Sequence, residues 1–195
     1  IKRPAVAANI AWELDENTNS RLDDIILSDA SRAPNCLPLL QYTLQELYLQ
    51  RANNKLCVKT YNELGGIEGA IGHKAEQLYE SLSEAVKNAL DNILPLIVNV
   101  TQSGNTLTSK TAHWDTLQTQ DERELVKQMV EHRLFVSFSN KGKASFKVAH
   151  EAVLRKWERV QKWVETHHNS LILKARLAEQ TSQWLVNNKN YAFLL

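Results

Sequence analysis

The stretch LFVSFSNKGKASFKVAH, residues 134–150, constrains the fold of this chain more than any other part of it. Two runs of alternating or β-rich residues flank NKGK, in which Gly142 can take a positive φ, so the stretch predicts a β-hairpin. Most of the remaining chain shows the helical spacing of apolar residues. The sequence therefore predicts a mainly α protein that contains a small β-hairpin.

The elements before this hairpin follow a recognisable order. A helix starts at Ser83, in a capping-box-like position, and runs through Leu94, and Pro95 is expected to end or kink it. A turn and a short strand follow in SGNTLTSK, then a short helix in AHWDTL and a longer one in TQDERELVKQMVEHRLF. Helix, short strand, helix, helix and hairpin is the order of a winged-helix module. Residues 83–150 are therefore predicted to form a winged-helix domain.

Residues 1–82 are predicted to form a helical subdomain, with an irregular lead-in over residues 1–17. Its first helix is expected to be capped by Asn19 or Ser20. The second helix is amphipathic, and its predicted buried positions are Leu37, Leu40, Leu44, Leu47 and Tyr48.

A short extended piece and a turn are expected in KLCVKTYNELGG, where Gly65-Gly66 breaks the pattern before helical spacing resumes at Ile67. Beyond the hairpin, residues 151–195 are predicted to form a C-terminal helical segment that stays helical to about Asn187. The chain thus divides into three predicted parts, with boundaries after residues 82 and 150.

Composition excludes several classes of protein. The formal net charge is +1, from 23 basic and 22 acidic residues, which does not favour wholesale binding to nucleic acid or to an anionic membrane. No apolar run has the length of a membrane span, and no secretory signal is present at the beginning. Cys36 and Cys57 do not make a disulfide framework, so we expect a cytoplasmic location. The missing initiator methionine is expected of a piece of a longer protein, and removal of a tag or processing would give the same result.

Motifs for catalysis are missing. The sequence has no G-x-x-x-x-G-K-[ST] loop, no G-x-G-x-x-G fingerprint and no Cys/His array with zinc spacing. The glycines of LGGIEGAIG lie inside a helical pattern, which disfavours a phosphate cradle, and the pair His167-His168 points to different sides of a helix. No feature marks an activated nucleophile. We therefore expect no enzyme activity, no metal and no cofactor in the isolated chain.

Two binding functions stay open as alternatives. A winged helix invites a role in DNA binding, but the helix in DERELVKQMVEHR is net acidic and would be repelled by phosphate, whereas the hairpin carries Lys141, Lys143 and Lys147. Nucleic acid is therefore not the expected partner. The second alternative is a helical protein-interaction module that docks a partner through tryptophans, which at helical spacing are more typical of a core. These are Trp157, Trp163 and Trp184.

His150 stands where the hairpin turns into a helix, at a place where a core strand more often carries Ile or Val. One interpretation is an imidazole that caps the following helix. The other begins with the free N–H groups and positive dipole end of a helix N-terminus, which suit an anion. A histidine at that point adds one more N–H donor for a phosphate oxygen.

Several blocks of the chain together resemble one protein family. The blocks are CLPLLQYTLQELYLQR, YNELGGIEGAIGHKAEQLYESL, KVAHEAVLRKWERVQKWVE and SQWLVNNKNYAFLL, in that order. They resemble the novel STAND group, the signal-transduction ATPases with numerous domains, over nearly the whole chain. In such proteins a P-loop core is followed by a helical lid and a winged helix, and all three close around ADP. The resemblance implies that residues 1–82 contain the lid.

The resemblance also assigns two site residues. His150 lies in a place like the histidine of the "MHD" motif in NB-ARC switches, which implies contact with the β-phosphate of ADP. Pro38 resembles the lid proline of a "GxP" motif that packs near the adenine, although Cys36 stands at the glycine position of that motif. The implied cofactors of the full-length protein are ADP or ATP with Mg.

The resemblance implies partners within one chain and a regulatory role. The P-loop core would lie upstream and a sensor or repeat domain downstream, with self-association of the whole protein as a further expectation. On this interpretation the chain is the lid and winged-helix portion of a signalling ATPase, and it relays nucleotide state to the downstream domains.

Overall fold

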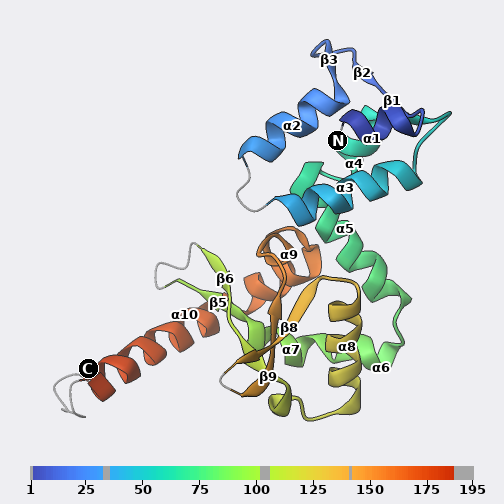
Figure 1. The fold of residues 1–195 in the computed structure, drawn as a ribbon. Helices are drawn as coiled ribbons and strands as arrows, with labels where there is room; N and C mark the ends of the chain where they lie inside the picture. The colour runs from blue at the N-terminus through green and yellow to red at the C-terminus, as the bar shows by residue number, and fades with distance from the viewer. Residues whose placement is uncertain (1, 33–35, 102–105, 141, 187–195) are drawn as a thin grey trace. The chain divides into compact units, whose positions relative to one another are not determined.

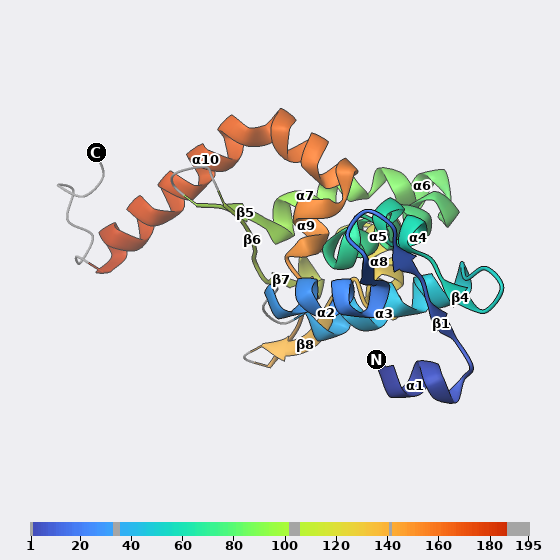
Figure 2. The same ribbon diagram turned by 90° about the horizontal axis from the view of Figure 1, so that it is seen from above.

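The computed structural model describes residues 2–32, 36–101, 106–140 and 142–186. The protein is mainly α-helical with small β-sheets, as the sequence predicts. It divides into two compact units, Ile1–Lys74 and Ala75–Leu195, and the helix α5 (Gly66–Ser81) begins in the first and ends in the second. Figures 1 and 2 show the elements of each unit from two directions. The three domains with boundaries after residues 82 and 150 remain a prediction.

The first unit combines short helices with two-residue strands. Before α5 its elements are α1 (Lys2–Ala7), β1 (Ala11–Trp12), β2 (Leu14–Asp15), β3 (Ser20–Arg21), α2 (Leu22–Arg32), α3 (Leu37–Leu49), β4 (Lys55–Leu56) and α4 (Val58–Glu63). Strand β1 pairs with β4 in parallel, and β2 pairs with β3 antiparallel.

The predicted irregular lead-in is wrong, because it contains α1, β1 and β2. Tertiary contacts hold these elements. The buried carboxylate of Asp23 receives two 3.1 Å hydrogen bonds from Arg21, and Lys2 lies 3.6 Å from the same carboxylate. The Glu13 amide donates to the carbonyl of Leu56. Pairing partners more than forty residues away leave no local pattern, so the lead-in looked irregular in the sequence.

The buried face of α3 agrees with the prediction at Leu47, which is fully buried, but differs at other positions. Leu37 is 75% exposed and Tyr48 45% exposed, whereas Leu39 and Thr43 are buried. The Thr43 hydroxyl lies 2.9 Å from the Leu39 carbonyl, which accepts its hydrogen bond, and 3.4 Å from the carbonyl of Ile67. A helix with leucines on several faces has no unique apolar stripe, so periodicity alone cannot select the face that packs.

The glycine-rich stretch has a backbone role. The stretch predicted as a short extended piece and a turn contains the short strand β4, then the unpredicted helix α4, and it turns at Gly65 and Gly66, whose φ angles are +71° and +72°. A Cβ at Gly69 would lie 2.2 Å from the Leu64 carbonyl oxygen. These positions require glycine for conformation and close approach, which accounts for the stretch without a bound phosphate.

The second unit contains the hairpin and its helices. After α5 its elements are α6 (Glu84–Asn88), α7 (Leu90–Ile97), β5 (Val98–Val100), β6 (Leu107–Ser109), β7 (Ala112–His113), the 3-10 helix η1 (Trp114–Thr116), α8 (Gln120–Glu131), β8 (Phe135–Asn140), β9 (Lys143–Val148), α9 (Ala152–Lys156) and α10 (Glu158–Val186).

The predicted hairpin is confirmed. Strands β8 and β9 pair antiparallel from Phe135↔Val148 to Asn140↔Lys143, and Gly142 in the turn has a φ of +80°. Strand β7 adds to the other side of β9, giving a three-stranded sheet in the order β7-β9-β8. The fully buried rings of Phe135 and Phe146 stack with centroids 6.3 Å apart inside this unit.

Details of the helix predicted from Ser83 to Leu94 are wrong. It breaks at Ala89 into α6 and α7, and Ser83 makes no side-chain capping bond. The sequence after Ser83 places Val86 at the third helical position, where a capping box needs Glu or Gln. Pro95 lies inside α7, and the helix ends two residues later at Ile97. The strand β5, which pairs with β6, was not predicted.

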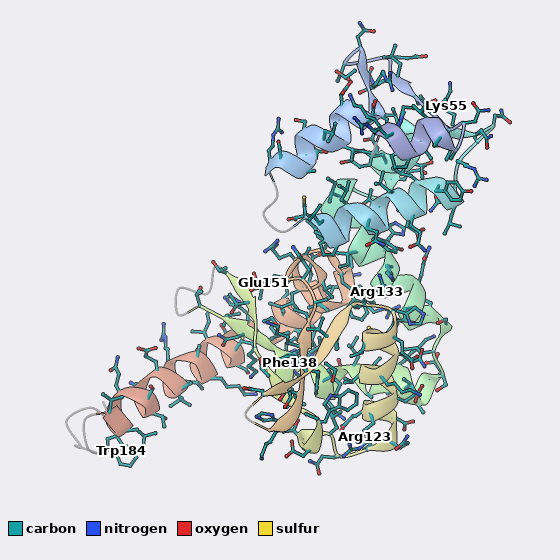
Figure 3. The ribbon with its side chains drawn as sticks, viewed as in Figure 1. Lys55, Arg123, Arg133, Phe138, Glu151 and Trp184 are labelled. Carbon is teal, nitrogen blue, oxygen red and sulfur yellow. The ribbon has the colours of Figure 1, made fainter. Side chains whose placement is uncertain are left out.

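The helical segment after the hairpin has a corner at Trp157, between α9 and α10. The predicted end at Asn187 lies outside the described residues. Within the second unit, α10 extends outward, and its far end, where Trp184 is labelled, lies away from the other elements (Figures 1, 2 and 3). Among the residues that the structure describes, no helix is both long and apolar enough to span a membrane.

Candidate functional site

His150 lies one residue before Glu151, the N-cap residue of α9, and its side chain caps the first amide of that helix. Its half-buried ring accepts a hydrogen bond at Nδ1 from the amide of Ala152, with 3.1 Å between the nitrogens. Its carbonyl accepts a second bond from the amide of Val153 at 3.0 Å. An Nδ1 atom that accepts a hydrogen bond carries no proton, so the neutral ring carries its hydrogen on Nε2. The capping interpretation of His150 is therefore part of the structure.

The second ring nitrogen is the atom that bears on ligand binding. Among the described residues, Nε2 of His150 has no hydrogen-bond partner within the protein. Helix α9 has only five residues, so its dipole adds little at this end. Any recognition of an anion here would therefore depend on the Nε2–H group rather than on the helix.

A carboxylate stands next to His150. The side chain of Glu151 accepts a 3.4 Å hydrogen bond from the amide of Ser109, and it lies 3.8 Å from the guanidinium of Arg155. These contacts tie the start of α9 to β6. They also offset the negative charge beside His150, which would otherwise oppose an approaching phosphate.

Pro38 lies in the first turn of α3, and its side chain is exposed beside the exposed Leu37. The residue at the glycine position of the implied motif, Cys36, has a φ of −74°. A negative φ is open to any L-residue, so the backbone here does not require glycine. The departure from the motif at Cys36 therefore does not disturb the start of α3. Pro38 belongs to the first unit and His150 to the second.

Three of the other histidines, His113, His132 and His167, contact the protein itself. Nδ1 of His113 lies 2.8 Å from the buried hydroxyl of Ser145, and Nδ1 of His132 and of His167 bond backbone carbonyls one turn back in their own helices. Within the described part of the chain, no three His, Cys, Asp or Glu residues are grouped to hold a metal ion.

Charged side chains of α8 form bonds within the second unit, although only Glu122 among them is buried. Arg123 donates a 2.9 Å hydrogen bond to the Leu117 carbonyl, and the 5%-exposed Glu122 closes the start of the helix. Lys127 pairs with Glu131 at 3.8 Å. A DNA-reading helix needs such groups free to face bases, so these contacts add nothing in favour of DNA binding. Of the hairpin lysines, Lys141 lies outside the described residues.

The tryptophans proposed to dock a partner differ in exposure. Trp157 is 1% exposed and Trp163 is 9% exposed, so both belong to the core of the second unit. Trp184 is half-buried near the end of α10. Core packing, the simpler explanation of the helical spacing, holds for the first two.

Sequence reasoning missed a polar cluster at Glu76. Its carboxylate receives hydrogen bonds from Trp157 and Arg159, which are 81 and 83 residues away. Burial opposes ionisation of this carboxyl, but the bonds from Arg159 and Trp157 outweigh that effect and hold the pKa of Glu76 below its usual value. No local motif marks a contact at this separation, although each residue stands in a block that resembles the STAND group.

Comparison with known proteins supports one family. The family described as Novel STAND NTPase 1 matches residues 1–192. No curated protein and no solved structure matches the chain. The matched range contains the hairpin, His150, Pro38 and nearly every other residue. The chain belongs to the novel STAND NTPase 1 family.

Proposed function

We propose that this chain is the lid and winged-helix portion of a STAND-type signalling NTPase. It closes over ADP held by a P-loop domain of the same protein and relays nucleotide state to domains beyond it. Membership of the family supports the general role, and the observation that carries the proposal for this chain is the capping geometry of His150. That geometry directs the ring proton to Nε2, the nitrogen that can donate to a phosphate oxygen.

The second unit supplies the frame for this role. The succession of α6–α7, β7, η1, α8 and the β8–β9 hairpin, with β7 paired to β9, has the order of a winged helix. In this assignment His150 directly follows the wing. The first unit supplies the lid, and the exposed Pro38 at the start of α3 is the residue that packs near the adenine.

The proposed mechanism is a two-state equilibrium. With ADP bound, the Nε2–H of His150 donates to a terminal phosphate oxygen and holds the winged helix in the closed state. ATP changes the charge and shape at that position and favours release. A charge-assisted hydrogen bond is worth about 1.5–3 kcal/mol, which is a tenfold or larger change in such an equilibrium.

In this proposal the chain contributes no catalytic group. Hydrolysis belongs to the P-loop domain, which binds the nucleotide with Mg, and this chain contributes binding and positioning through His150 and Pro38. The sensor domain downstream is the partner that receives the signal.

The test uses the full-length protein with its P-loop domain and three variants of His150. His150→Asn keeps an acceptor near Nδ1 but has no group at Nε2, His150→Gln places an amide N–H near Nε2, and His150→Ala removes both. We expect ADP to dissociate about tenfold faster from the Asn and Ala variants than from the wild type. The Gln variant should retain ADP more strongly than those two variants. Wild-type ADP retention in His150→Asn would show that Nε2 does not read the nucleotide.

A further inference from the structure

The corner between α9 and α10 is bonded to α5 through one carboxylate. Trp157 is 1% exposed, and its indole Nε1–H donates to Glu76 with a nitrogen–oxygen distance of 2.7 Å. The Nε–H of Arg159 donates to both oxygens of the same carboxylate at 2.9 and 3.0 Å. Glu76 therefore joins the corner residue Trp157 to Arg159 in the first turn of α10.

Aromatic contacts complete this cluster, which we call the Glu76 clamp and define as Glu76, Tyr79, Trp157 and Arg159. The Arg159 guanidinium lies 4.2 Å from the ring centroid of Tyr79. The rings of Tyr79 and Trp157 meet edge to face with centroids 5.9 Å apart. Arg159 also pairs with Glu80, one turn further along α5. Charge, hydrogen bonds and ring packing thus act at one point.

The clamp lies close to His150 along the chain. Between them is α9, a helix of five residues whose two ends are both fixed. Nδ1 of His150 bonds the Ala152 amide at its start, and the Trp157 amide donates to the Val153 carbonyl at its end, at 3.2 Å. Ala152, Val153 and Leu154 are all buried, so α9 is a short, packed segment that cannot shift at one end alone.

We propose that the Glu76 clamp is a coupling device that makes α9, the start of α10 and the second half of α5 respond together to a change at His150. Glu76, Trp157 and Arg159 are its positioning residues. As a route for nucleotide state this inference rests on the proposed function, but the mechanical link can be measured in the absence of nucleotide.

The location of the clamp on α5 gives the link its consequence. Helix α5 carries the chain from the first compact unit into the second, and the boundary between Lys74 and Ala75 falls just before Glu76. A residue that binds α5 at this point determines how firmly the second half of the helix belongs to the second unit. Loss of the Glu76 carboxylate would free that half without removing any core side chain, because Glu76 itself is half-buried.

The test is hydrogen exchange of backbone amides in the 195-residue chain without nucleotide. In Glu76→Gln, whose amide oxygen can still accept from Trp157, and in Trp157→Phe, we expect the amides of residues 75–81 to exchange about tenfold faster. The matched control is Lys162→Gln, which breaks an exposed 3.4 Å pair with Glu158 in the first turns of α10 and should leave those amides unchanged. An equal acceleration throughout the chain in both clamp variants would reduce the clamp to a general stabilising contact and overturn the proposal.

The coupling itself is tested by adding His150→Ala. In the wild-type background this variant should accelerate exchange in α9 and in residues 75–81, and in the Glu76→Gln background it should add no further change at residues 75–81. If the amides of residues 75–81 exchange in His150→Ala as slowly as in the wild type, the proposed coupling is wrong. If Trp157→Phe does not fold, Glu76→Gln and Arg159→Gln carry the test. If His150→Ala changes exchange at residues 75–81 but does not change ADP retention, the proposed function is wrong and the coupling through the clamp is supported.

Discussion

Two helices of the second unit, α8 and α9, begin with side-chain caps of different construction. At α8 the hydroxyl of Thr119 accepts from the Glu122 amide at 3.2 Å, and the Glu122 carboxylate accepts from the amides of Thr119 and Gln118 at 3.2 and 2.6 Å. At α9 a single imidazole nitrogen of His150 accepts from the Ala152 amide at 3.1 Å. In the first cap, which we call closed, both side chains bond within the protein. In the second, which we call open, one ring nitrogen of His150 is left without a partner among the described residues.

The difference shows what each cap adds to the protein. The α8 cap directs its hydroxyl and carboxylate to the backbone and to Asn92, whose amide donates to Glu122 at 2.9 Å, so it has a structural role alone. An asparagine at this position could supply an acceptor for the Ala152 amide as the histidine does. What the imidazole adds is a second nitrogen pointing elsewhere, which is the physical basis for giving His150 a binding role.

The largest effect is expected at Glu122. Glu122→Ala removes the acceptor for two amides and for Asn92 at a 5%-exposed position, and should lower the free energy of unfolding by about 2–3 kcal/mol. Denaturant unfolding of the two proteins measures it. Asp121→Ala, an exposed change in the same helical turn, is the control and should lower it by at most about 0.5 kcal/mol. Equal losses of stability in the two variants would show that the bonds of Glu122 add no more to stability than an exposed charge does.

Thr119→Ala should have a smaller effect. It removes one half of the capping box, so we expect a loss of about 1 kcal/mol in the free energy of unfolding. Thr119→Ser keeps the hydroxyl and should stay close to the wild type. The same denaturant titration compares them, and a serine variant as unstable as alanine would mean that the methyl group, rather than the cap, matters.

At His150 the effect on stability should be smaller again. His150→Ala removes a single capping bond, for a loss of about 0.5–1 kcal/mol, whereas His150→Asn keeps an acceptor and should lose less. Thermal and denaturant unfolding measure both. The comparison sharpens if His150→Asn keeps its stability but loses ADP retention in the full-length protein. If His150→Asn instead lowered the free energy of unfolding by several kcal/mol, the ring would act mainly through core packing.

The smallest effect is expected at Ser83. Its side chain makes no capping bond to α6, so Ser83→Ala should change the free energy of unfolding by less than about 0.5 kcal/mol. A loss near 1 kcal/mol would place Ser83 among the side-chain caps and contradict the geometry.

These caps also show where local sequence is informative. The spacing T-x-x-E in TQDE, which was not among the predicted caps, meets the rule for a capping box and forms one. Ser83 was singled out without the required Glu or Gln at the third position, and no capping bond forms. The complete rule therefore gives the right result in both places, because it requires both the N-cap residue and the Glu or Gln at the third helical position.

The candidate site was predictable in part for a similar reason. The position of His150 at the end of β9 and its capping role follow from a hairpin signal next to a helical one, both of which are local. The strands of the first unit and the buried face of α3 depend on partners far along the chain, and sequence periodicity does not contain them. The Glu76 clamp joins residues about eighty positions apart and belongs to the same category.

The sequence by itself determined the mainly helical class, the hairpin with its Gly142 turn and the position of His150 between the hairpin and the next helix. Each of these depends on side chains within a few residues of one another. Tertiary structure decided which atoms of those residues remain available. The hydrogen bond from the Ala152 amide determines the tautomer of His150. Packing buries Trp157 and Trp163 in the core, and it places Glu76 beside the corner before α10. Burial and hydrogen-bond pairing are properties of the packed chain, and they become fixed only when distant segments meet.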